Sequence, residues 1–203
     1  MNWTTCLAGL PEDIALCGPL TLLRYLLLLG LLDCASGQAA ARMTGKSRVF
    51  YLPRFGYRKW CRFVLRHSCL ATLPILAAAL LLSLWRSTDT AWSVVIAAML
   101  LGLNIITLTG AQTLLIALFD SASAGFVPLI LIQLLSVLAS KYLPGPWKLL
   151  IPGNWGMAAR STLGSKDGLP LLWMLCIEVA LLIAMWTEGW RLVRRYDRRE
   201  GRT

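Results

Sequence analysis

Histidine is almost absent from this chain of 203 residues, in which His67 is the only one. Metalloprotease and serine–histidine chemistry both need a histidine beside acids or a nucleophile. The neighbouring Ser68 follows His67 directly, so the two side chains point off different sides of a helix. We therefore expect no catalytic site and no enzymatic activity in this chain.

A nucleotide-binding loop is also missing. Gly45-Lys46-Ser47 matches the end of the phosphate-binding motif, but that motif needs a glycine five residues earlier, where Ala40 stands. The six cysteines form no CxxC pair, and free cysteine packs as a small hydrophobic residue. We expect this chain to bind no cofactor and no metal, and not to hydrolyse ATP by itself.

The sequence lacks a polar stretch long enough for a soluble domain, since the longest has only about 25 residues. Hydrophobic residues make up 57% of the chain, against about 45–50% in soluble proteins. They form blocks close to the roughly 20 residues that a transmembrane helix needs. The first 13 residues hold two acids and no basic side chain, so we expect no cleavable signal peptide. The sequence predicts an all-α, polytopic membrane protein.

The apolar blocks predict one transmembrane domain over residues 1–203 with about five spans. A basic segment follows the first block, and a segment rich in Pro, Gly and Trp precedes the last, where we expect short interfacial or re-entrant helices. The expected spans are 14–41, 63–85, 91–118, 126–140 and 169–190. The segments between and after them are a basic loop at 42–62, an external segment at 141–168 and a basic tail at 191–203.

The charge distribution predicts the orientation. The formal net charge is +10, and the range 42–66 holds eight basic residues and no acid. Such segments stay on the cytoplasmic side, and four spans separate this loop from the arginine-rich tail, so both can lie inside. We expect a plasma or inner membrane location with a cytoplasmic C-terminus. Basic residues beside apolar spans indicate contact with lipid and not with nucleic acid.

Polar residues inside the spans are the next candidates for functional residues, because charged groups inside a membrane are energetically costly and often have a function. The charged residues inside the spans are Arg24, Asp33 and Glu178. They either line a transport path or form interhelical pairs, and a pair of Glu178 with Arg24 is one option. We expect Asp33 to lie near the cytoplasmic end of its span. We expect interhelical hydrogen bonds from three amide side chains, Asn104, Gln112 and Gln133.

Three segments together resemble a known family. They are Ser47 to Trp60 (SRVFYLPRFGYRKW), 151–161 (IPGNWGMAARS) and 194–198 (RRYDR). From about Tyr25 onward, the chain is similar to ABC-2-type permease subunits, the membrane halves of one class of ATP-binding-cassette exporter. The resemblance implies separate ATPase subunits that bind ATP and Mg, and a second permease copy or related chain. The family usually has six spans, so this chain would be a shortened member, similar to those of bacteriocin or peptide-antibiotic export and immunity systems.

The resemblance also implies site residues. A short helix in the cytoplasmic loop would dock on the ATPase, and Pro53 is a permitted helix start. The implied coupling residues are Tyr51, Arg54, Phe55, Tyr57, Arg58, Lys59 and Trp60, and the implied external gate contains Trp147, Asn154 and Trp155.

Alternatives remain open for this segment and for the whole chain. The basic and aromatic groups of the loop could instead bind lipid headgroups. The chain could be a non-transporting immunity or scaffold subunit, or a membrane enzyme that uses Asp33 and Glu178. The leading expectation is a permease that exports a hydrophobic or peptide-like compound.

Overall fold

A computed structural model describes residues 7–10, 18–86, 91–139, 142–143, 145–162 and 168–199. Within these residues the protein is helical, as predicted, and one isolated β-bridge joins Ser161 to Leu169. The long helices are α2 (Pro19–Arg86), α3 (Ala91–Phe119), α4 (Ala122–Ala139) and α5 (Leu171–Arg199). Among the described residues, the short 3-10 helices η3 (Gly145–Leu150), η4 (Pro152–Asn154) and η5 (Ala158–Arg160) precede α5.

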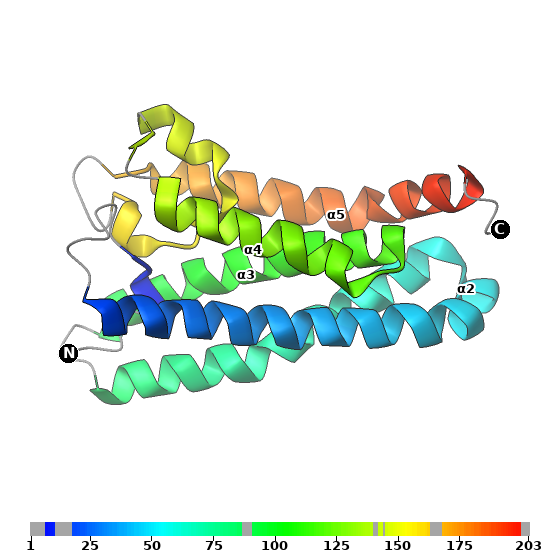
Figure 1. The fold of residues 1–203 in the computed structure, drawn as a ribbon, viewed down its shortest axis with the longest axis horizontal. Helices are drawn as coiled ribbons and strands as arrows, with labels where there is room; N and C mark the ends of the chain where they lie inside the picture. Colours follow the sequence, from blue (N-terminus) through cyan, green and yellow to red (C-terminus); the bar gives the residue numbers. More distant parts are fainter. Residues whose placement is uncertain are drawn as a thin grey trace.

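Helix α2 consists of two helical arms joined by a sharp turn at Gly56. The backbone of Gly56 has φ 72° and ψ 166°, in a region that essentially only glycine adopts. The first arm covers residues 19–55 and the second covers 57–86, and Figure 1 shows the second arm running back beside the first. The chain therefore forms a helical hairpin where the sequence predicted two spans and a loop.

The cytoplasmic loop expected at 42–62 is helical on both sides of Gly56. The predicted helix start at Pro53 is wrong, because Pro53 lies inside the first arm, three residues before the turn. A proline there has no N–H to donate to the carbonyl four residues earlier, so the last turn of the first arm lacks one helical hydrogen bond. The first arm extends past the apolar block, and Met43 and Leu52 on this extension pack, partly buried, against a core cluster.

The two arms of α2 and helices α3, α4 and α5 lie side by side in a bundle of five helical segments, as Figure 1 illustrates. Four of them are long and apolar enough to cross a membrane: Pro19–Gly45, Arg48–Trp85, Trp92–Phe119 and Leu171–Arg199. The fifth, Ala122–Leu138, is shorter but also apolar. Only 11% of the apolar window in α5 is buried, so most of that helix faces outward, as a lipid-facing helix does. These features describe a membrane-spanning protein.

The two ends of the bundle differ in chemistry. The Gly56 turn, the Asp120–Ser121 turn and the end of α5 lie at one end, which we call the basic end (Figure 1). Residues 145–162 and the starts of α2 and α5 lie at the opposite end. The basic segment and the basic C-terminal helix end thus share one end, as the even number of intervening spans requires.

Candidate functional site

The outer surface of the Gly56 turn exposes aromatic and basic side chains. Tyr51 is 42% exposed and Phe55 is 51% exposed, and their rings stack with centroids 5.7 Å apart. Three basic neighbours on the same turn are also exposed. We call this surface the turn ridge, and it consists of Tyr51, Arg54, Phe55, Arg58 and Lys59. The ridge is the part of the predicted coupling segment that a partner can reach.

Trp60 does not belong to the accessible surface, so its predicted role in docking is corrected. Its side chain is 1% exposed and packs in a core cluster with Cys61, Val64, Leu114 and Val193. Trp60, Cys61 and Val64 recur at the spacing of one helix face, the pattern of a buried stripe. That periodicity was the available signal that Trp60 points inward.

Tyr57, another predicted coupling residue, also turns inward and contacts a buried carboxylate. Its hydroxyl donates to Asp197 Oδ2 at 2.9 Å, and Arg48 donates to Asp197 Oδ1. Asp197 is fully buried, and the Arg48 guanidinium lies 6.0 Å from the centre of the Trp60 ring. We call Arg48, Tyr57 and Asp197 the Asp197 cluster.

The Asp197 cluster joins several helices at the basic end. Arg48 and Tyr57 come from the two arms of α2, and Asp197 comes from α5. Arg48 also donates to the Ala117 carbonyl at 3.4 Å, at the end of α3. Removing one partner of a buried ion pair strongly destabilises the folded protein, because the other charge is left buried without compensation. The turn is therefore held firmly to α5, a contact that the sequence analysis did not foresee.

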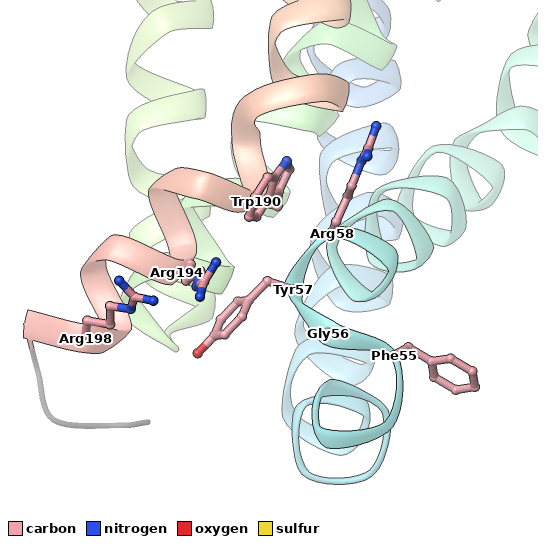
Figure 2. Close-up of a pocket in the computed structure, with 7 residues that line it drawn as sticks. All are labelled: Phe55, Gly56, Tyr57, Arg58, Trp190, Arg194 and Arg198. Carbon is pink, nitrogen blue, oxygen red and sulfur yellow. The ribbon is translucent and has the colours of Figure 1, made fainter.

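A pocket of about 620 Å³ opens between the Gly56 turn and α5. Its lining consists of Phe55, Gly56, Tyr57, Arg58, Trp190, Arg194 and Arg198. Figure 2 shows Tyr57 pointing from the turn toward α5, where Trp190, Arg194 and Arg198 follow one another along the helix. The ring of Phe55 points away from α5. The pocket thus combines three arginines with aromatic walls and contains no acidic side chain in its lining.

A first buried polar group inside the bundle surrounds Asp33. Gln133 of α4 donates to Asp33 Oδ1 at 3.2 Å, and Ser36 donates to Gln112 Oε1 of α3 at 2.7 Å. Gln112 also donates to the Asp33 carbonyl at 3.4 Å. Both glutamines thus form interhelical hydrogen bonds. Asp33 lies near the middle of the first arm of α2 and not near the basic end, and its Oδ2 finds no hydrogen-bond partner among the described residues.

A second buried polar group ties α3, α5 and the segment at 145–162 together. Asn104 Nδ2 donates to Glu178 Oε1 and to the Pro152 carbonyl, both at 2.8 Å. Gly156 packs so closely on Asn104 that a Cβ there would lie 2.6 Å from the Asn104 Cβ. The partner of Glu178 is thus Asn104 and not the half-buried Arg24. Glu178 is fully buried, as the sequence suggested.

The expected gate residues lie in two different environments. Trp147 is 57% exposed, whereas Asn154 and Trp155 are buried. Trp155 Nε1 donates to the Leu149 carbonyl at 2.8 Å, and Asn154 Nδ2 donates to the Lys148 carbonyl at 2.9 Å. These bonds fold the segment at 145–162 back on itself, so its buried tryptophan and asparagine shape the segment.

Arg160 anchors this segment to the bundle, and the sequence analysis missed it. It is 1% exposed and donates to the Leu10 carbonyl at 2.8 Å, to Asn154 Oδ1 at 2.6 Å and to the Ser136 carbonyl of α4 at 2.5 Å. Its only sequence signal was that it is the single basic residue of the stretch 151–161. Across the described residues, no group of three His, Cys, Asp or Glu side chains could hold a metal ion.

Comparison with known proteins leaves the family open. No family model matches the sequence, and no curated protein or solved structure matches it either.

Proposed function

We propose that this chain is the membrane subunit of an ATP-driven exporter of the ABC-2 type. Separate ATPase subunits would bind ATP and Mg and hydrolyse the nucleotide. The exported compound would be hydrophobic or peptide-like, and a second copy or a related chain would complete the path. The basic end faces the cytoplasm of a plasma or inner membrane, because loops and helix ends rich in Lys and Arg stay inside.

The observation that supports this proposal best is the two-sided construction of the Gly56 turn. On its outer side, the turn ridge exposes paired aromatic rings with arginine and lysine, a surface suited to a groove on a partner. On its inner side, Tyr57 and Arg48 bind the buried Asp197 of α5. A membrane subunit without a nucleotide site needs a contact surface that an ATPase can reach and that is rigidly connected to the transmembrane helices.

A continuous set of contacts leads from the turn to the external segment. Asp197 and Glu178 both lie on α5, about 28 Å apart along the helix axis. Glu178 binds Asn104, which in turn holds the Pro152 carbonyl of the external segment. In the proposed mechanism, ATPase closure pushes the turn ridge, tilts α5 and shifts the external segment through Asn104. The external segment then acts as the outer gate.

Co-purification in a mild detergent tests the proposal. The tagged chain is expected to retain, in stoichiometric amount, a soluble protein with a complete phosphate-binding loop and ATPase activity. Replacing Arg54 and Phe55 with alanine is expected to release that protein. Replacing Trp92, which is 73% exposed and lies at the opposite end, is the matched control and should release nothing.

Retention of no ATPase under several detergents would contradict the proposal. That result would favour a non-transporting immunity or scaffold subunit, which keeps the same helical bundle but needs no source of force.

A further inference from the structure

The pocket between the Gly56 turn and α5 has a charge that the fold leaves uncompensated. Arg58, Arg194 and Arg198 line it, and no ion pair joins any of them to a carboxylate in the described part of the chain. The nearby Asp197 is fully buried, and both its oxygens already accept from Arg48 and Tyr57. Glu188 pairs with Arg191 at 2.6 Å. The pocket is therefore ready to accept an anion.

The lining residues of the pocket on α5 extend from the apolar span toward the end of the helix. Trp190, Arg194 and Arg198 are spaced four residues apart, so they form one stripe along α5. The tryptophan lies at the end of the stripe nearer the apolar span, as Trp side chains do at the level of lipid headgroups. One turn further in, Trp186 is 42% exposed, and two turns further in, Ile183 is 58% exposed. An anion in the pocket would thus have an apolar helix surface directly beside it.

We propose that this pocket binds the phosphate headgroup of an anionic phospholipid, with the acyl chains lying along the exposed surface of α5. Arginine forks bind phosphate oxygens in pairs, and basic pockets between transmembrane helices on the cytoplasmic side bind anionic headgroups. The pocket volume of about 620 Å³ lies in the usual range of small-molecule sites. Tyr57 is fixed by its bond to Asp197, so one wall is preformed. This inference does not depend on the transport proposal.

Native mass spectrometry of the purified chain in a neutral detergent tests this site, with phosphatidylglycerol or phosphatidylcholine added. Arg194→Gln combined with Arg198→Gln is expected to weaken retention of phosphatidylglycerol by roughly thirtyfold, the effect of two lost arginine contacts. The control is Arg195→Gln combined with Arg199→Gln. This pair removes the same charge from the same turns of α5 but lies outside the pocket lining, so retention should stay near that of the unchanged protein.

Each other outcome overturns the inference. An equal loss of phosphatidylglycerol retention in the two double variants would mean that the lipid binds only through the overall charge of the helix end. Displacement of phosphatidylglycerol by inorganic phosphate would identify a free-anion site, because a lipid held also by its acyl chains resists that exchange. If the pocket variant kept its lipid but lost a bound ATPase, the pocket would belong to the protein partner. All four arginines are exposed, so both variants should fold, and their melting temperatures check this.

Discussion

Asp197 is the side chain on which the basic end depends most. It is fully buried and accepts from Arg48 and Tyr57, so the turn and α5 share one buried charge. Asp197→Asn keeps the shape but removes the buried counter-ion of Arg48, which then has only the exposed carboxylate of Asp120, 4.0 Å away. We expect a loss of about 3–5 kcal/mol in unfolding free energy, the usual effect of breaking a buried pair. Thermal unfolding in detergent measures it.

The exposed pair of Glu188 and Arg191 provides the control for that prediction. Both side chains are about half exposed, and such pairs contribute about 0–1 kcal/mol. Glu188→Gln should therefore leave the melting temperature almost unchanged. Equal shifts for Glu188→Gln and Asp197→Asn would show that Asp197 does not hold the helices together.

Variants of Trp60 and Phe55 distinguish an effect on stability from an effect on partner binding at the same turn. Its burial predicts that Trp60→Ala costs about 3–5 kcal/mol in unfolding free energy. Phe55→Ala, on the exposed ridge, should cost far less and act only on partner binding. Melting temperatures of the two variants check this difference. If Phe55→Ala destabilised the protein as much as Trp60→Ala, the ridge would be part of the core.

At the scale of secondary structure, the helical hairpin of α2 depends on the backbone of Gly56. Its φ of 72° with ψ of 166° is strained for any other residue, so Gly56→Ala should lower the unfolding free energy by about 1–3 kcal/mol. Gly45, in the helical first arm with open space at its Cβ position, is the control. Gly45→Ala should raise the unfolding free energy by about 0.5–1 kcal/mol, because alanine favours helix.

Opposite changes in melting temperature for these two variants are the expected signature of the hairpin. If Gly56→Ala stabilised the protein as Gly45→Ala does, the two arms would form one uninterrupted helix.

The segment at 145–162 is also held by one asparagine of α3. Asn104→Leu removes its bonds to Pro152 and Glu178, so the segment should open more often. A cysteine introduced at the fully buried Ser161 reports the opening, and its maleimide labelling should accelerate about tenfold, as expected for two lost buried hydrogen bonds. Thr107→Val is the control, since Thr107 bonds only within α3. Unchanged labelling in Asn104→Leu would rule out this anchor.

On the scale of the whole molecule, the sequence predicted the helix class and the approximate spans because long apolar blocks have few other structures available. It did not predict the Gly56 turn, since glycine conformation depends on the tertiary context. It also missed Arg160 and the Asp197 cluster, because ion pairs and carbonyl contacts between distant helices leave no local pattern. The inward position of Trp60 was readable from its spacing to Cys61 and Val64.

The orientation of the bundle is a separate prediction. In a variant without native cysteines, a cysteine at the exposed Ser123 near the basic end should resist a membrane-impermeant maleimide added to intact cells. A cysteine in place of the exposed Trp147, at the opposite end, should react. The reverse labelling pattern would place the basic end outside.

The central claim is that the turn ridge receives force from an ATPase, and photo-crosslinking in cells tests it most directly. A photoreactive amino acid in place of Phe55, which is 51% exposed at the turn, should crosslink to a soluble protein with a nucleotide-binding loop. The same amino acid in place of Trp92, at the opposite end, should not. Crosslinks from position 55 to lipid or to a second copy alone, with no nucleotide-binding protein, would contradict the account.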